Sequence, residues 1–274
     1  MTQTTPLATP SAAAAGTLSI GADLRVHRLG FGAMRLTGPG VWGAPADRPA
    51  AIRVLRRALE LGVNFIDTAD SYGPGVSEEI IAEALHPYPP GLVIGTKGGL
   101  TRAGPGHWGR DAHPAHLRAA CEGSLRRLRL PRIDLYQLHA VDPRVPLEDS
   151  LGELARLRTE GKIRHIGVSN VSAAELVRAQ RTVTVVSVQN RYNLADRDSD
   201  DVLRDCELAG IAFIPWFPLG AGRDASNAQS AIAWLLARSP VMLPIPGTSS
   251  VAHLEENVAA ANIRLSARDL QAMT

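Results

Sequence analysis

The sequence predicts an α/β fold, a (β/α)8 TIM barrel with an N-terminal β-hairpin. Its 274 residues are 45% hydrophobic and 20% charged, which suits one large domain with a sizeable core. Short apolar runs alternate with helical patterns, and eight such β-then-α units fill the chain. A doubly wound sheet is the alternative, but no Gly-x-Gly-x-x-Gly turn opens a helix after an early strand.

Two features precede the repeating units. Residues 1–16 are rich in Thr, Ala, Pro and Ser and lack both a basic start and an apolar run, so we expect a disordered tail. Residues 18–26 read as a hairpin with a turn at Gly21, which should close the bottom of the barrel. We therefore expect the barrel domain to span residues 17–274.

The eight predicted core strands are short apolar runs bounded by turn residues. They fall at residues 29–34, 64–67, 92–97, 133–139, 163–168, 183–189, 211–217 and 241–245. The predicted helices have apolar residues at helical spacing, and several end at a glycine. They fall at residues 52–59, 77–85, 114–129, 147–160, 173–180, 199–209, 228–238 and 251–261. Ser77 is the expected cap of the second helix, and a long loop should follow the third strand up to Asp111.

Composition and charge exclude several classes of function. A formal charge of +2 without a contiguous basic patch argues against a nucleic-acid partner and against a membrane surface. No apolar run approaches the about 20 residues of a membrane span. Cys121 and Cys206 lie in helical patterns and suit buried small hydrophobes better than a disulfide or a metal site. We expect a cytoplasmic protein, a monomer or weak homo-oligomer, that acts on a small molecule.

Four ionisable residues stand where predicted strands end. Three strand-like runs close on Asp67, Lys97 and His139, and Tyr72 follows Asp67 by five residues. Singly, each has an ordinary interpretation as a turn cap, a surface residue or a core histidine. The strand ends of a parallel barrel meet at one face, so all four should share one pocket with Asp67 paired to Lys97. We expect Lys97 to lower the pKa of Tyr72 from about 10, which would make the phenol a proton donor at neutral pH.

These motifs resemble those of the aldo-keto reductase family. Residues 65–73, Gly-Thr-Lys at 95–97 and Gln-Leu-His at 137–139 match the family's Asp, Tyr, Lys and His tetrad in order. The resemblance runs from about residue 18 to the C-terminus, and it implies NADPH-dependent reduction of an aldehyde or ketone to an alcohol.

By the family's mechanism, each tetrad residue has an expected role. Tyr72 would protonate the carbonyl oxygen while a nicotinamide hydride attacks the carbon, and Lys97 and Asp67 would tune that phenol. His139 would orient the carbonyl.

The resemblance also assigns cofactor contacts. Ser169, Asn170 and Gln189 would bind the nicotinamide carboxamide, and Trp216 would stack on the nicotinamide ring. Later segments would hold the pyrophosphate, the adenosine 2′-phosphate at a helix N-terminus, and the adenine. The implied set is Gly32, Met34, Asp67, Ser169, Asn170, Gln189, Trp216, Phe217, Pro218, Leu219, Gly220, Gly247, Thr248, Ser249, Ser250, Glu256 and Asn257.

Two departures from the family's pattern concern this cofactor. Gly247 stands in place of a lysine and His253 in place of an arginine around the 2′-phosphate. We therefore expect NADPH as the cofactor because the family generally uses it, and NADH stays an alternative. Between Gly220 and Asn227 only six residues remain where relatives have a longer loop, which should loosen cofactor retention or mark reduced activity.

Residues 32–43, 214–219 and 245–257 carry a closer resemblance, to a bacterial branch of the family that includes pyridoxal reductases. It implies reduction of pyridoxal or a similar aromatic aldehyde, with Trp42 and Trp108 as walls of the substrate pocket; ordinary loop packing is nearly as good an interpretation of the two indoles. Two other classes stay open: a nicotinamide-binding regulatory or sensor protein with little turnover, and a structural relic without cofactor.

Overall fold

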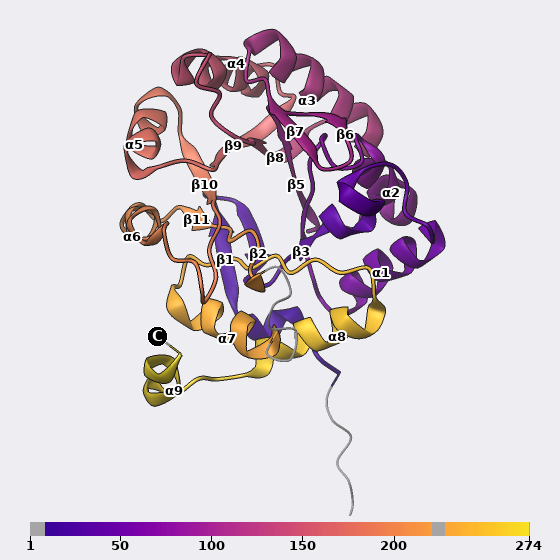
Figure 1. Cartoon of the computed structure of the whole chain (residues 1–274), viewed down its shortest axis with the longest axis vertical. Helices are drawn as coiled ribbons and strands as arrows, with labels where there is room; N and C mark the ends of the chain where they lie inside the picture. The colour runs from indigo at the N-terminus through magenta and orange to yellow at the C-terminus, as the bar shows by residue number, and fades with distance from the viewer. Residues whose placement is uncertain (1–8, 221–227, 274) are drawn as a thin grey trace, which may run out of the picture.

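In the computed structural model, which describes residues 9–220 and 228–273, seven parallel strands form one curved sheet with helices around it (Figure 1). The strand order is β11-β10-β9-β8-β5-β4-β3. The strands are β3 (Phe31–Gly32), β4 (Phe65–Asp67), β5 (Val93–Gly98), β8 (Ile133–Leu138), β9 (Ile163–Ser169), β10 (Val185–Gln189) and β11 (Ala212–Phe213). This order keeps successive strands adjacent, as the repeating pattern predicts.

An irregular segment after α7 closes the sheet into a barrel. On one side, the backbone N–H of Leu243 donates to the carbonyl of Phe213 over 2.8 Å. On the other side, the N–H of Gly30 donates to the carbonyl of Pro244 over 2.9 Å. Pro244 and Pro246 have no backbone N–H, so this segment cannot form a continuous ladder of backbone hydrogen bonds. It nevertheless occupies the position of the eighth strand. The predicted (β/α)8 barrel is confirmed.

Helices cover the outside of the barrel. They are α1 (Arg48–Glu60), α2 (Val76–Leu85), α3 (Pro114–Leu128), α4 (Leu147–Thr159), α5 (Ala173–Thr182), α6 (Asp200–Ala209), α7 (Ala228–Arg238) and α8 (Val251–Ala259). A ninth helix, α9 (Ala267–Ala272), was not expected from the pattern; a capping box between Ser266 and Asp269 begins it. Each barrel helix starts near the C-terminal end of the preceding strand, so the helix N-termini gather at one face with the loops that carry the candidate site.

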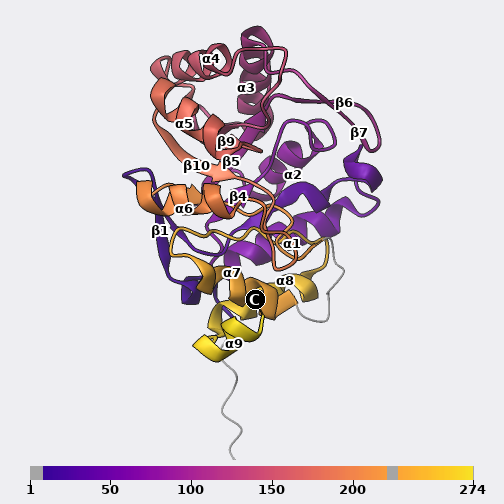
Figure 2. The same ribbon diagram turned by 60° about the vertical axis from the view of Figure 1, so that its left-hand side comes forward.

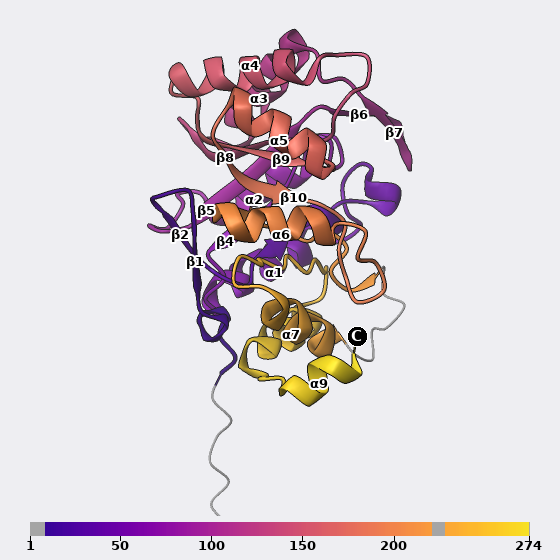
Figure 3. The same ribbon diagram turned by 90° about the vertical axis from the view of Figure 1, so that its left-hand side faces the viewer.

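Two hairpins lie at opposite ends of the barrel (Figures 2 and 3). The first, β1 (Thr17–Ile20) with β2 (Leu24–His27), is the predicted one, and its apolar residues Ile20, Leu24 and Val26 belong to the same buried cluster as residues of the strands. Burying these side chains seals the N-terminal end of the barrel. The second, β6 (Leu100–Gly104) with β7 (His107–Arg110), occupies the stretch expected to be a loop.

Three expectations from the sequence need correction. The disordered tail does not extend to residue 16, because Ala12–Ala15 form a 3-10 helix and the N–H of Ala12 donates to the carbonyl of Leu61 over 2.8 Å. The long loop before Asp111 contains the β6–β7 hairpin, since short polar strands give no apolar alternation to detect. Ser77 is not the helix cap; it is buried, and its hydroxyl accepts from Thr68 over 2.8 Å. Residues 1–8 lie outside the described part of the chain.

No helix in the described ranges is long and apolar enough to cross a membrane.

Candidate active site

The four predicted residues meet at the C-terminal face of the barrel. Asp67 ends β4, Lys97 lies near the end of β5, His139 follows β8, and Tyr72 lies in the turn before α2. The Lys97 ammonium nitrogen is 2.7 Å from Oδ2 of Asp67 and 5.2 Å from the centre of the Tyr72 ring. The Tyr72 and His139 rings are 5.9 Å apart, centre to centre. All four side chains are buried.

The Asp67–Lys97 ion pair has further hydrogen bonds that compensate its burial. The amide of Gln189 donates to the other oxygen of Asp67 over 2.8 Å, and the amide of Gln137 donates to it over 3.4 Å. Lys97 also donates to the carbonyl of Thr68 over 2.8 Å. A buried charge is tolerated only when its remaining hydrogen-bonding capacity is used, so this arrangement fixes both groups in place.

The pKa of Tyr72 differs from the expectation. Burial raises it above 10, and the Lys97 cation offsets only part of that effect. The prediction of a lowered phenol pKa is therefore wrong for the protein without ligands. Burial also lowers the pKa of Lys97, but Asp67 and Tyr72 outweigh it and the net shift is upward, so Lys97 stays charged at neutral pH.

His139 is a neutral imidazole at neutral pH. Burial, with a contribution from the Lys97 charge, holds its pKa well below the usual 6.5. Its Nδ1 lies 3.4 Å from the hydroxyl of Ser71. A neutral imidazole carries one N–H donor, and this ring is edge-on to the Tyr72 phenol. Tyr72 and His139 can therefore both donate a hydrogen bond to one acceptor atom.

The predicted carboxamide-binding residues lie beside this cluster. The amide of Asn170, a residue with φ of +57°, donates to the carbonyl of His139 over 2.9 Å, and its oxygen accepts from the indole of Trp216 over 2.9 Å. Ser169 donates to the carbonyl of Gln189 over 2.7 Å. Ser169 and Gln189 are buried, whereas Asn170 and Trp216 are more open at the mouth.

Residues 217–220, predicted to contact a pyrophosphate, form a tight turn. Phe217 and Gly220 both have positive φ, and the N–H of Gly220 donates to the carbonyl of Phe217 over 3.0 Å. Asn193 also donates to that carbonyl over 3.1 Å. Pro218 and Leu219 lie within the turn. The shortened loop predicted to affect cofactor retention falls on residues 221–227, which lie outside the described ranges.

The predicted 2′-phosphate segment leads into α8. Ser250 caps that helix by accepting from the N–H of His253, and Thr248 accepts from the N–H of Ser250 over 3.0 Å. Ser249 is exposed beside them. Of the two predicted adenine contacts on α8, Glu256 is exposed and Asn257 is buried.

Gly247 is glycine for a steric reason. A Cβ at this position would meet the carbonyl oxygen of Gly32, at the end of β3, at 2.4 Å. A lysine cannot stand here without moving the backbone. Met34, two residues beyond Gly32, is half-buried, and its carbonyl accepts from the hydroxyl of Thr37 over 2.9 Å.

Arg35 lies beside the predicted 2′-phosphate segment and was not among the residues expected from the sequence. It lines, together with Ser249, a cavity of about 260 Å³ between the first loop and the start of α8. In the described part of the chain, Arg35 has no ion-pair partner, and its side chain is exposed. The available signal was a lone cation directly after Met34. The Cγ of Arg35 lies 3.7 Å from the position that a Cβ of Gly247 would take.

The two predicted wall residues are joined through an arginine. The Arg102 guanidinium lies 3.6 Å from the centre of the Trp108 ring and 5.8 Å from that of Trp42. Trp108, which is 43% exposed, meets the Tyr72 ring edge-on at 6.5 Å. Both indoles thus stand on the Tyr72 side of the barrel mouth.

All donors of Arg102 are engaged with backbone carbonyls. Two bonds are short, at 2.7 Å each, to Val41 and Gly40, and three longer bonds of 3.3 Å go to Ser71, Gly104 and His107. Arg102 therefore fastens the β6–β7 hairpin to the loop that carries Trp42 and to the residue before Tyr72. No donor remains free for a ligand.

Comparisons with known proteins identify the class of this chain. The Aldo/keto reductase family model matches residues 28–224 and 223–274. An uncharacterized oxidoreductase of Schizosaccharomyces pombe is 50% identical, over 97% of this chain and 91% of the relative. Pyridoxine 4-dehydrogenase of Escherichia coli is 46% identical, over 88% of this chain and 91% of that enzyme.

A solved structure has the same fold. An aldo-keto reductase from Klebsiella pneumoniae in complex with NADPH superposes with a TM-score of 0.80 at 29% identity, covering 94% of this chain and 93% of that one. The chain belongs to the aldo/keto reductase family. It is an NAD(P)H-dependent oxidoreductase.

Proposed function

We propose that this protein reduces the carbonyl group of an aromatic aldehyde to an alcohol with NADPH, and that pyridoxal is its leading candidate substrate. The observation that carries the proposal is the buried Asp67–Lys97 pair directly behind Tyr72. The 46% identity to a pyridoxine 4-dehydrogenase supports the choice of substrate. A cytoplasmic location and a monomer or weak homo-oligomer remain predictions.

Tyr72 is the proposed proton donor. Burial raises its pKa, so its hydroxyl is protonated at neutral pH and ready to donate. After the proton leaves, the Lys97 ammonium stabilises the phenolate, and Asp67 holds that ammonium in place. His139, neutral, donates its N–H to the same carbonyl oxygen and fixes the direction from which the carbonyl approaches.

The residues around the mouth suit NADPH, which when bound would supply the hydride that reduces the carbonyl carbon. Asn170 and Trp216 offer an amide and an aromatic face beside His139. The N-terminus of α8, with Ser249 and with Arg35, which makes no ion pair among the described residues, is a donor set suited to a phosphate. An NADPH complex of a Klebsiella relative with the same fold supports this assignment.

The aromatic walls favour a flat substrate. Trp108 lies edge-on to Tyr72, and Trp42 is fastened next to it through Arg102. A planar aldehyde that contacts such walls gains about 0.5–1.5 kcal/mol beyond the burial of its area. An aliphatic aldehyde of similar reactivity lacks that gain.

The test is a comparison of kcat/KM for pyridoxal, its phosphate and a straight-chain aldehyde, followed by NADPH absorbance. Pyridoxal should exceed the straight-chain aldehyde, and Trp42→Ala should reduce that margin while NADPH binding is unchanged. Equal values for all three would remove the substrate assignment. Tight NADPH binding without turnover of any aldehyde would indicate a nicotinamide-binding sensor, and absence of NADPH binding would indicate a structural relic.

A further inference from the structure

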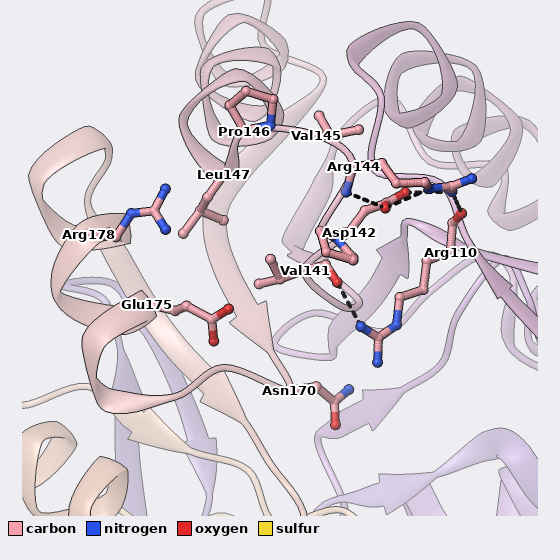
Figure 4. Close-up of a pocket in the computed structure, with 11 residues that line it drawn as sticks. Arg110, Val141, Asp142, Arg144, Val145, Pro146, Leu147, Asn170, Glu175 and Arg178 are labelled. Carbon is pink, nitrogen blue, oxygen red and sulfur yellow. Dashed lines mark hydrogen bonds and ion pairs between the residues drawn. The ribbon is translucent and has the colours of Figure 1, made fainter.

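We propose that the protein has an anion subsite next to the candidate active site, which binds a carboxylate or phosphate group of the carbonyl substrate through Arg110. This proposal rests on the proposed reductase function and specifies its substrate class. The subsite is a cavity of about 500 Å³ at the barrel mouth, between the loop after β8 and the start of α5 (Figure 4). That volume suits a small molecule.

The cavity adjoins the tetrad through two neighbours of His139. Asn170, which lines the cavity, donates to the carbonyl of His139 over 2.9 Å. Val141, also in the lining, follows His139 by two residues, so their Cα atoms are at most about 7 Å apart. Arg110 donates from Nη1 to the carbonyl of Val141 over 3.1 Å, as Figure 4 shows. A substrate held at His139 can therefore extend a substituent to Arg110.

Arg110 differs from the other two arginines of the cavity. Arg144 binds both oxygens of Asp142, at 3.0 and 2.8 Å, and Arg178 binds both oxygens of Glu148, at 3.0 and 2.9 Å. Such bidentate pairs neutralise the charge of each arginine. Within residues 9–220 and 228–273, Arg110 has no carboxylate partner and one hydrogen bond, to a neutral carbonyl.

Neighbouring residues contact Arg110 without neutralising the charge of its guanidinium group. Arg144 donates to the backbone carbonyl of Arg110, while the same guanidinium is anchored on Asp142. The carboxylate on the opposite wall, Glu175, belongs to the capping box of α5, where its Oε2 accepts from the N–H and hydroxyl of Ser172 over 2.8 Å each, and it makes no ion pair with Arg110. Four donors of the Arg110 guanidinium remain for a ligand, and a planar fork of this kind matches a carboxylate or a phosphate.

Two pairs of aldehydes test the proposal, each made of an anionic member and a neutral counterpart, and the change that Arg110→Gln causes within a pair is compared so that differences in intrinsic reactivity cancel. The pairs are 4-carboxybenzaldehyde against its methyl ester, and pyridoxal 5′-phosphate against pyridoxal. We expect the wild-type kcat/KM to favour the anionic member of at least one pair by about tenfold, the worth of one charge-assisted contact. Arg110→Gln should remove that preference and leave the neutral members unchanged. Preference in one pair alone identifies which anion the subsite accepts.

Arg158→Gln is the matched control, because Arg158 is exposed in the last turn of α4, whereas the cavity borders the first. Equal kcat/KM within both pairs for the wild type would overturn the proposal. An equal loss of kcat/KM for both members of a pair in Arg110→Gln would also overturn it. A loss of kcat/KM that follows weaker NADPH binding would overturn it as well, because Arg110 would then be a cofactor contact.

Binding of the same aldehydes to the NADP⁺-bound protein, followed by tryptophan fluorescence, separates this proposal from the proposed function. No reduction can occur in that state. Tighter binding of an anionic member that depends on Arg110 supports the subsite even if no aldehyde is turned over. Equal binding of both members excludes it.

Discussion

Lys97 and Asp67 form an ion pair of 2.7 Å in which neither side chain has appreciable contact with solvent. Among the described residues each of these two side chains makes its ion pair with the other, so removing one member changes the stability of the fold and the chemistry of the site together. The pair stabilises the closed barrel only while intact, and it keeps a cation 5.2 Å from the centre of the Tyr72 ring.

Replacing Tyr72 with Phe removes only the hydroxyl that we propose as proton donor. The rate of aldehyde reduction should fall by about 10² to 10⁴, the usual contribution of general acid catalysis. NADPH affinity, measured by fluorescence titration, should stay within about twofold of the wild type, since the amide of Asn170 and the indole of Trp216 are untouched. A variant that keeps most of its activity would show that another group donates the proton.

Lys97→Met should destabilise the protein as well as inactivate it. The substitution leaves the Asp67 carboxylate buried without a cation, which costs about 3–5 kcal/mol of unfolding free energy. Urea unfolding measures the loss. The double variant Lys97→Met with Asp67→Asn removes the orphaned charge and should regain part of the stability. If the single variant were as stable as the wild type, the buried pair would not contribute as argued.

Arg102→Ala should loosen the substrate walls without disabling the tetrad. Five bonds to backbone carbonyls and two indole contacts are lost, so the β6–β7 hairpin is released from the loop of Trp42. The KM for an aromatic aldehyde should rise about tenfold, with kcat changed less, as expected when binding alone is weakened. Arg102→Lys keeps a cation near Trp108 but loses the planar guanidinium and most of its hydrogen bonds. The KM of this variant should therefore lie between those of the wild type and Arg102→Ala. A proportional loss in kcat would instead place Arg102 in the chemical step.

Arg35→Ala tests the origin of cofactor preference. If Arg35 contacts a 2′-phosphate beside Ser249, its loss should reduce the ratio of kcat/KM for NADPH over NADH by about tenfold. Arg158→Ala, at the other end of the barrel, is the control for a general change in charge. An unchanged ratio would assign the discrimination to Ser249 and the N–H groups of α8 alone.

Asp70 should give the protein a pH-dependent loss of stability. Burial, followed by the nearby charge of Glu78, raises its pKa to about 8, against the offsetting cations Arg127 and Lys97. One oxygen of Asp70 has no hydrogen-bond partner. Between the ordinary value of 3.8 and about 8, the folded state holds a proton that the unfolded state releases, so stability falls as pH rises through this window.

Asp70→Asn removes that proton linkage. Relative to the wild type, the variant should therefore gain at least about 1 kcal/mol in unfolding free energy between pH 4 and pH 8. Taking the difference between the two proteins cancels the opposite contribution of His139, whose lowered pKa favours stability at higher pH. Parallel stability curves across this range would show that Asp70 is ionised in the folded protein.

The barrel and the meeting of its four central residues could be predicted from the sequence. Apolar runs that end on Asp67, Lys97 and His139 specify both the strands and their polar ends, because a buried parallel strand has to be apolar until it reaches the mouth. The short polar strands of the β6–β7 hairpin and the 3-10 helix at Ala12–Ala15 carry no such periodicity. Their structure depends on contacts with distant segments.

Only the tertiary structure decided the electrostatic state of the site and the placement of its cations. The pKa of Tyr72 rises because burial outweighs Lys97, and burial is a property of the whole fold. Arg102 and Arg110 lie eight residues apart in one hairpin, yet all donors of the first are engaged by carbonyls, whereas the second makes one hydrogen bond, to the Val141 carbonyl, within the described part of the chain. Sequence fixes which charges are present; the three-dimensional neighbours of each charge determine whether it is neutralised or left to bind.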